Sequence, residues 1–131
     1  MANKITSEEL KKMLNMHEQY LQCIDHGKKA NFDNIDLTDH TNALIGLDLS
    51  GCSFVNANMS GLNLTCVNFS ESDLSGANLT NAKLHGAWIV GCLVEGTNFE
   101  NADFDGALVE ATDLEEAINT DKAININKNL I

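Results

Sequence analysis

The chain has 131 residues, a length that suits one domain with a core of its own. Its 19 acidic and 8 basic residues give a net charge of −11, which argues against a direct nucleic-acid binder because such proteins need a basic face. The charge also disfavours an anionic membrane. Residues 1–25 lack the apolar stretch of a secretory leader, and no apolar run reaches about 18 residues, which predicts a cytoplasmic protein.

The first segment has the pattern of an amphipathic helix. Thr6 and Glu9 have the spacing of a capping box, which marks a helix N-terminus. One face of the helix would then carry Leu10, Met13, Leu14, His17, Leu21 and Ile24. Gly27 is a favourable residue just beyond a helix end, so the pattern predicts a helix over residues 7–26. Residues 1–29 are expected to form a cap, because the apolar stripe needs a surface to cover.

Residues 42–116 repeat with a period of five. The third residue of each block is Leu, Phe, Met, Ile or Val, fifteen times in succession from Leu44 to Leu114. This period fits neither an α-helix nor a simple strand alternation, and unbroken internal repetition is the sequence signature of a solenoid. Two similar blocks precede it over residues 30–39, so His40 and Thr41 form a two-residue insertion between the two registers.

The position two residues after each apolar centre predicts a turn. Eight of the nine glycines stand there, and Asn56, Asn81 and Asn101 take the same place in other blocks. Gly and Asn tolerate positive φ, which the third residue of a type II turn requires. The position two residues before the centre is mostly small or apolar and suits the interior. Each block is therefore a short extended segment followed by a corner.

Several blocks resemble the Ala-(Asp/Asn)-Leu-x-x pattern of the pentapeptide-repeat proteins. The best matches are Ala57-Asn58-Met59, Ala77-Asn78-Leu79 and Ala102-Asp103-Phe104. The resemblance covers residues 30–116 and implies an all-β fold: a right-handed quadrilateral parallel β-helix of about four coils over residues 30–118, with the N-terminal α-helix as its cap. Four blocks per coil would stack residues twenty apart, so the apolar centres form four inward columns. Residues 119–131 are expected to cover the other end, as a strand or as a loop.

The sequence offers few groups for chemistry. The cysteines, Cys23, Cys52, Cys66 and Cys92, lack the spacing of a metal site and are interpreted as reduced thiols. Of these, Cys52 and Cys92 are expected to point into the core, and Cys66 to be exposed at a corner. His85 is expected beside Asp105 in an outward column, while the Asn58, Asn78 and Asn98 side chains are expected to stack along one face. We expect neither a catalytic residue set nor a cofactor or metal.

Four apolar residues stand at positions that the repeat directs toward water. They are Trp88, Val90, Leu93 and Leu108. An outward apolar group with the chain's one tryptophan predicts a protein-interaction patch. A second interpretation stays open at this point, in which the C-terminal tail folds back and covers these side chains.

Acidic residues gather in the last blocks of the repeat. They are Glu95, Glu100, Asp103, Asp105, Glu110, Asp113, Glu115 and Glu116. Residues 30–116 hold 14 acidic residues and a single lysine, Lys83. Such a girdle has two interpretations. It can be an ordinary solvated surface, or it can be a docking surface for a basic partner or a mimic of the DNA phosphate backbone.

These observations favour a non-enzymatic protein-interaction or scaffold module whose partner is a protein of unknown identity. Nucleic acid and membrane are not expected as partners, and a homodimer is compatible with the pattern. The resemblance implies an alternative, because some pentapeptide-repeat proteins mimic DNA and bind a topoisomerase such as DNA gyrase. The short repeat region fits that alternative less well, since those relatives are longer dimeric rods.

Overall fold

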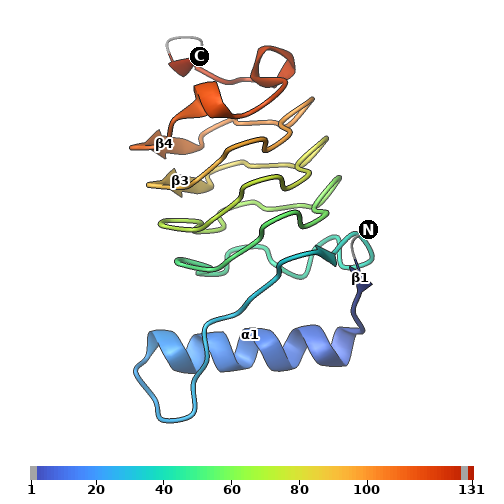
Figure 1. The fold of residues 1–131 in the computed structure, drawn as a ribbon, viewed down its shortest axis with the longest axis vertical. Coiled ribbons are helices and arrows are strands. Elements are labelled where there is room, and N and C mark those ends of the chain that lie inside the picture. Colours follow the sequence, from blue (N-terminus) through green and yellow to red (C-terminus); the bar gives the residue numbers. More distant parts are fainter. Residues whose placement is uncertain (1–2, 128–129) are drawn as a thin grey trace.

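The structure, a computed structural model, describes residues 3–127 and 130–131 as a stack of coils with a helix lying across one end (Figure 1). Its elements in chain order are β1 (Asn3–Lys4), α1 (Ser7–Leu21), β2 (Ile35–Asp36), β3 (Trp88–Val90), β4 (Leu108–Glu110) and the short 3-10 helices η1 (Leu114–Glu116) and η2 (Thr120–Lys122). Within the described residues, α1 is neither long nor apolar enough to cross a membrane.

Helix α1 begins as the sequence predicts. The Thr6 hydroxyl oxygen accepts a hydrogen bond from the Glu9 N–H at 3.1 Å, and the Glu9 carboxylate accepts one from the Thr6 N–H at 3.0 Å. Leu10 and His17 are buried against the first coil, with Met13 and Leu14 packed beside them. The helix therefore covers the open end of the core, as expected of a cap.

The end of α1 corrects the sequence prediction. The helix stops at Leu21, five residues before the expected end, because Cys23 adopts a left-handed conformation with φ of 57°. The Cys23 N–H donates to the Tyr20 carbonyl and the Ile24 N–H to the Gln19 carbonyl, the pattern of a Schellman motif. Gly27 has another role: a Cβ there would lie 2.4 Å from the Tyr20 backbone nitrogen, so only glycine allows the return chain to approach the helix this closely.

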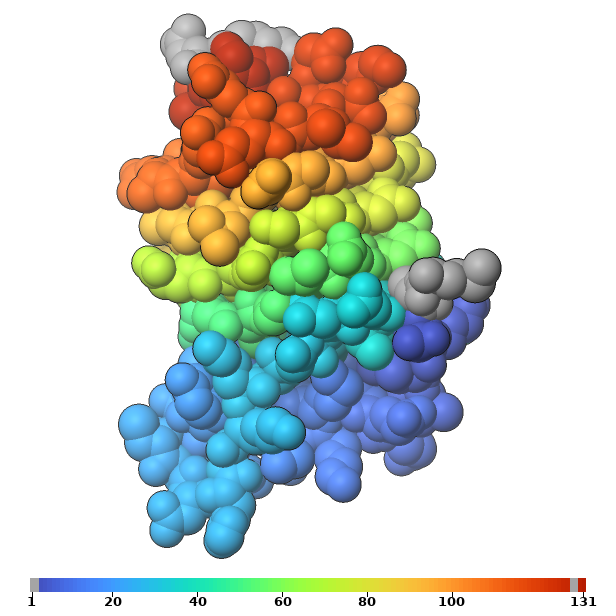
Figure 2. Space-filling model, viewed as in Figure 1, coloured from blue at the N-terminus to red at the C-terminus, as the bar shows by residue number. Residues whose placement is uncertain are grey.

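The coils pair in parallel with a register of twenty residues. Asn58 bridges Asn78, and Asn78 bridges Asn98. Before the insertion the register is twenty-two, since Asp36 bridges Asn58, which confirms the two extra residues at His40 and Thr41. The register agrees with four five-residue blocks per coil, and the coils appear as successive layers above the helix (Figure 2).

A turn closes every side of the coil. Gly86, for example, has φ of +67°, and the N–H of the next residue, Ala87, donates to the Leu84 carbonyl at 3.0 Å. Since few residues per side lie between turns, most coil segments form isolated bridges. Among the described residues, only β3 and β4 pair over three residues. Asn58, Asn78 and Asn98 form one column as expected, and each Oδ1 accepts a hydrogen bond from the N–H two residues later in its own block.

We predict that Gly61→Ala lowers the free energy of unfolding by about 1–2 kcal/mol, the strain of an L-residue in left-handed backbone. Gly61 has φ of +70°, and a Cβ there would meet nothing within 4 Å, so steric contact adds nothing to the effect. Gly61→Asn is the matched control and should lose less, because Asn56, Asn81 and Asn101 already adopt this conformation in other coils. Urea denaturation measures both variants, and equal losses would contradict the strain argument.

The inward columns form one continuous core. The apolar centres are buried from Phe32 to Phe104 and again at Leu114, whereas Val109 near the C-terminal end is half-buried. Two polar residues in the core are satisfied by backbone carbonyls: the Ser72 hydroxyl donates to Leu49 at 3.0 Å, and the Thr97 hydroxyl donates to Leu74 at 2.6 Å. Cys52 and Cys92 are buried as predicted.

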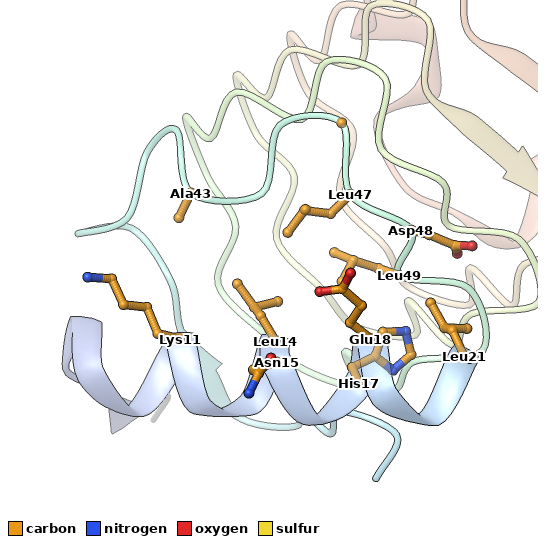
Figure 3. Close-up of a pocket in the computed structure, with 11 residues that line it drawn as sticks. Lys11, Leu14, Asn15, His17, Glu18, Leu21, Ala43, Leu47, Asp48 and Leu49 are labelled. Atoms are coloured by element: carbon orange, nitrogen blue, oxygen red, sulfur yellow. The ribbon is translucent and has the colours of Figure 1, made fainter. Parts of the chain in front are cut away.

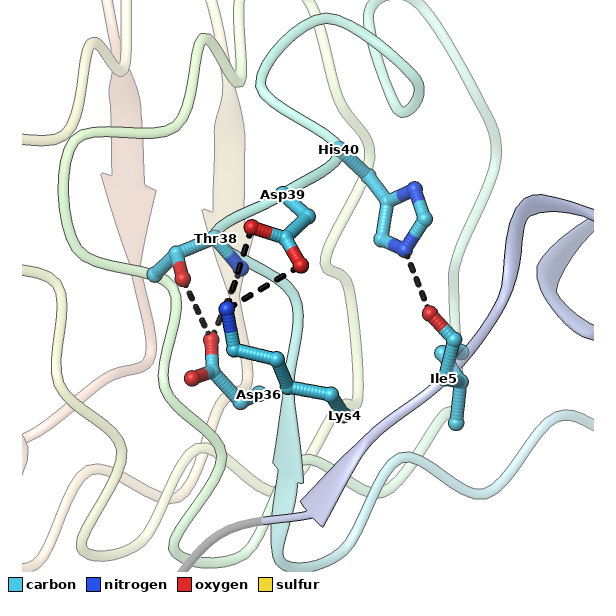
Figure 4. A network of polar contacts seen from close by, with 6 residues as sticks. All are labelled: Lys4, Ile5, Asp36, Thr38, Asp39 and His40. Carbon is cyan, nitrogen blue, oxygen red and sulfur yellow. Dashed lines mark hydrogen bonds and ion pairs between the residues drawn. The ribbon is translucent and has the colours of Figure 1, made fainter.

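The N-terminal lead forms a clasp that the sequence did not predict. Strand β1 pairs with β2 in parallel, and the Lys4 ammonium contacts the Asp39 carboxylate at 3.0 Å (Figure 4). The His40 ring bonds to the Ile5 carbonyl oxygen through Nε2 at 2.9 Å. The two-residue insertion thus supplies a side chain that holds the chain just before α1.

The C-terminal tail continues the stack beyond the expected boundary. Ile118 bridges Asn98, and Ile124 bridges Asp103 after one extra residue. Ile126 is buried over the end of the core, with Ala117 and Ala123 packed beside it. The described part of the tail is thus a coil-like segment that contains η2, and it covers part of the end as expected.

Candidate functional site

The four outward apolar residues lie on two neighbouring coils around the corner at Gly91: Trp88 and Val90 stand before the corner, Leu93 stands just after it, and Leu108 stands on the next coil beside Trp88. We call Trp88, Val90, Leu93 and Leu108 the apolar ledge. Trp88 pairs with Leu108 across β3 and β4, while Val90 and Leu93 flank the turn at Gly91. Trp88 is 52% exposed, Leu93 59% and Leu108 39%. The described part of the tail leaves these side chains open to solvent, so of the two interpretations only an exposed patch agrees with the structure.

The ledge arises from a change of residue type at one repeat position. The residue before each centre is usually Asn or Asp, and it forms the bridge to the neighbouring coil. Asn68 lies directly beneath Trp88, and Asp73 lies directly beneath Leu93. The backbone is therefore the same in both coils, and the apolar side chains of the third coil are not needed to build it.

The acidic girdle does not form a single patch. Successive members five residues apart follow successive turns, so Glu95, Glu100, Asp105 and Glu110 point away from different sides of the coil. Two members of the girdle, Glu110 and Asp113, lie next to the ledge. Glu110 pairs with Val90. Asp113 comes directly after Thr112, whose hydroxyl oxygen accepts a hydrogen bond from the Cys92 N–H beside Leu93.

Three members of the girdle lie beside a histidine or a lysine of the same chain. His85 lies between two carboxylates, with Nε2 3.2 Å from Asp103 and Nδ1 3.7 Å from Asp105. The pair expected with Asp105 is present, and Asp103 joins it. Hydrogen bonds from the Asn125 amide and from the Asp105 N–H lower the pKa of Asp103. Glu100 lies 3.9 Å from the Lys122 ammonium. These acids belong to a solvated ion-pair surface.

Two further carboxylates border the ledge, and the sequence prediction missed both. Asp73 lies beneath Leu93, and Glu71 lies beneath Gly91, where a Cβ would be 3.0 Å from its Oε1. Glu71 also occupies a corner position that usually holds Gly or Asn, with φ of 61°. Stacking the sequence by twenties would have found them, because they stand twenty residues before Gly91 and Leu93.

A cleft of about 440 Å³ lies between α1 and the first coil (Figure 3). Leu14, Leu47 and Leu49 form much of its apolar lining, while Lys11 and Glu18 lie on the helix side. Its volume is within the range of ligand pockets. The cleft could not be predicted from the sequence, because it depends on the position of the helix over the first coil. Among the described residues, no three His, Cys, Asp or Glu side chains are arranged to hold a metal ion.

His17 and Cys52 meet beneath the cap. The Cys52 Sγ lies 3.6 Å from His17 Nε2, and His17 Nδ1 accepts a hydrogen bond from the Ala30 N–H at 3.2 Å. Burial raises the pKa of the Cys52 thiol to about 12, so the thiolate needed for nucleophilic chemistry is not formed at neutral pH. The pair resembles a catalytic dyad by residue type only, and it serves packing.

We predict that His17 makes the protein less stable as the pH falls below about 6.5, the ordinary pKa of histidine. Burial lowers the pKa of His17, partly opposed by the Asp48 carboxylate. The unfolded chain therefore binds a proton at His17 more readily than the folded chain, so stability is complete above this pH and declines below it. His17→Gln keeps an acceptor for the Ala30 N–H and should show a smaller loss between pH 7 and 5.5 in urea titrations. Identical pH dependence of the two proteins would contradict the assignment.

The comparisons with known proteins agree with the geometry. A family model for pentapeptide repeats matches eight copies over residues 44–81, 67–96 and 77–115. The known structures of that family are right-handed quadrilateral β-helices. No curated protein matches the chain.

Solved structures of other repeat proteins are similar to the chain. HetL, a pentapeptide repeat protein involved in heterocyst differentiation regulation from the cyanobacterium Nostoc sp. strain PCC 7120, shares 28% identity over 74% of this chain and 41% of its own, with a TM-score of 0.57. QnrB1, a plasmid-mediated fluoroquinolone resistance protein, shares 25% identity over 68% of this chain and 46% of its own, with a TM-score of 0.44. The pentapeptide repeat protein alr5209 from Nostoc PCC 7120 shares 25% identity over 97% of this chain and 92% of its own, with a TM-score of 0.40.

The chain spans less than half the length of the first two of these structures. The family model nevertheless matches the greater part of the chain, and its matches coincide with the stacked coils and their turns. Together the repeat, the twenty-residue register and the family match lead to one conclusion: the chain belongs to the pentapeptide-repeat family.

Proposed function

We propose that this chain is a non-enzymatic protein-binding module whose partner docks on the apolar ledge. The observation that carries the proposal is the exposure of Trp88 and Leu108, which are paired on neighbouring coils, together with the exposure of Leu93 just beyond the corner at Gly91. Monomeric proteins seldom leave several large apolar side chains contiguous in water without a use for them, and tryptophan is the residue most enriched at binding hot spots. The fold itself needs none of these side chains.

The family supports the same class of function. Pentapeptide-repeat proteins are generally structural or interaction modules rather than enzymes. We infer that the coil of this chain is right-handed and quadrilateral, as in the known structures of the family, so that each turn presents its side chains from a rigid corner. A rigid corner loses little conformational freedom on binding, which favours affinity from a small patch.

Affinity capture with matched variants tests the proposal. Trp88→Asn and Leu93→Asp remove the ledge with residues that the chain already carries one coil below, at Asn68 and Asp73, so the fold should persist. Asn78→Asp adds the same charge as Leu93→Asp at the equivalent position on the next side of the coil. Lysate of the cells that make the protein is passed over each immobilised form, and the captured proteins are purified and tested for direct binding.

The expected result is a protein that binds the wild type and the Asn78→Asp control but neither ledge variant. Circular dichroism should be unchanged in all four proteins, which separates loss of the surface from loss of the fold. Capture that is equal in every form would show that the partner docks elsewhere, and the ledge would lose its role.

DNA mimicry toward a topoisomerase such as DNA gyrase is a second prediction, motivated by the 14 acidic residues of the repeat. The placement of the acidic residues gives DNA mimicry little support. Successive members of the girdle point from different sides of the coil, and three of them pair with His85 or Lys122. A gyrase supercoiling assay tests it directly. Supercoiling that is unaffected by excess protein would remove this function.

A further inference from the structure

We propose that the ledge binds an extended segment of a partner protein in which an arginine stands next to an apolar residue. The inference rests on the proposed function and adds the chemistry of the partner. It comes from the charges around the ledge, from the exposed indole of Trp88, and from the residue types that this chain lacks.

Carboxylates border the ledge below and above. We call Glu71, Asp73, Glu110 and Asp113 the carboxylate ring. Below the third coil, Asp73 bridges Leu93 and Glu71 lies beneath Gly91. Above it, Glu110 pairs with Val90. Asp113 follows Thr112, whose hydroxyl oxygen contacts the Cys92 N–H next to Leu93. Apolar side chains therefore form the centre and negative charges the border.

The carboxylate ring has no cation of its own among the described residues. The ion pairs among the described residues are formed by Lys4, His85 and Lys122. None of these side chains pairs with a carboxylate of the ring. The single lysine of the repeat, Lys83, bridges Asn63 and Asp103 on another side of the coil. A cationic partner would therefore gain attraction at the ring without displacing an internal ion pair.

The indole of Trp88 makes arginine a better fit than lysine. A guanidinium stacks on an aromatic face and can at the same time donate two hydrogen bonds to a carboxylate. Glu110 stands two residues after Leu108, the pairing partner of Trp88, and alternate residues of a strand share one face. An arginine stacked on Trp88 would thus have the Glu110 carboxylate beside it, while a neighbouring apolar side chain meets Val90 and Leu93.

This sequence of 131 residues contains no arginine, so no segment of it has the proposed chemistry. Its eight basic residues are all lysines, at positions 4, 11, 12, 28, 29, 83, 122 and 128. A second copy could offer only lysine to the carboxylate ring. The occupant is therefore a different protein, and its recognition combines stacking, a charge-assisted pair and apolar contact.

Short peptides test this inference with a signal at the site. Trp88 is the only tryptophan, so its fluorescence reports a ligand on the ledge. The probe is the end-blocked peptide Gly-Ser-Arg-Leu-Arg-Leu-Gly-Ser, and matched peptides carry Lys for Arg or Ser for Leu. The arginine peptide should shift the fluorescence and bind roughly two- to fivefold more tightly than the lysine peptide, the factor expected of an exposed cation–π contact. The serine peptide should give no shift.

Variants assign the charge contribution to the ring. Binding is measured by fluorescence anisotropy with a labelled arginine peptide. The double variant Glu71→Gln/Glu110→Gln should weaken binding. The control double variant Glu100→Gln/Asp105→Asn, on other sides of the coil, should not. Equal binding of the arginine and lysine peptides, or equal weakening by the two double variants, would show unspecific attraction to an acidic protein and overturn the inference. The proposed function would survive that outcome, since it fails only if lysate capture ignores the ledge variants.

Discussion

Replacing Phe54 with alanine should lower the free energy of unfolding by about 3–5 kcal/mol, the usual loss for a buried aromatic residue. Phe54 is fully buried at the centre of its block. Its ring stacks on Phe32 with the ring centroids 4.9 Å apart, and it meets the edge of Phe69 at 5.5 Å. Alanine would leave a cavity that spans two coils, and the backbone ladder above and below prevents the site from collapsing.

Trp88→Ala is the control for Phe54→Ala, because it removes a larger aromatic ring from the outside of the same coil stack. Trp88 is about half exposed, so its loss should change the free energy of unfolding by about 1 kcal/mol at most. Urea titrations followed by circular dichroism measure both variants. Equal losses would mean that the assignment of inward and outward columns is wrong.

Leu10→Asp should detach the cap and lower the stability by at least about 3 kcal/mol, because it removes buried apolar contact and places a charge against the core. Leu10 is 2% exposed and belongs to the core cluster that runs through the coils. Once the helix leaves, the lower end of the stack exposes apolar side chains and unpaired backbone groups, which favour association between molecules.

Light scattering after gel filtration measures the association that Leu10→Asp is expected to cause. Wild type should elute as one species at a concentration where Leu10→Asp forms larger assemblies. Lys12→Asp, an exposed change on the same helix, should behave as wild type. A Leu10→Asp protein that keeps both its elution volume and its unfolding midpoint would show that α1 is not a structural cap.

The sequence predicts the repeating part of this protein well because one physical rule acts in block after block. A buried centre and a positive-φ corner recur from the block of Leu44 to the block of Phe104, so a corner such as Glu71 that is neither Gly nor Asn does not disturb the pattern. The ledge was predictable for the same reason: Trp88 and Leu93 break a polar column and are visible against it. The rule fails where the repetition ends. Cys23 ends the helix in a left-handed conformation that is more typical of glycine. The periodicity of the sequence does not predict this end.

Other features depend on contacts between distant segments. Strand β1 has two residues, too few to form a pattern, and the Lys4–Asp39 contact, the His40–Ile5 bond and the backbone bond from the Asn3 N–H to the Asn34 carbonyl join it to the first coil. The cleft under α1 depends on the position of the helix over Leu47 and Leu49. The carboxylate ring joins residues about two coils apart, such as Asp73 and Asp113, so it becomes visible only once the coil register is known.

Hydroxyl-radical footprinting of the chain bound to its captured partner tests directly whether partner proteins dock on the apolar ledge. Trp88, Leu93 and Leu108 are exposed enough to be oxidised in the free protein. Ile45, which is 42% exposed near the cap, provides an internal control. We expect the partner to protect the three ledge residues and to leave the oxidation of Ile45 unchanged. Protection of Ile45 with full oxidation of the ledge would contradict this expectation.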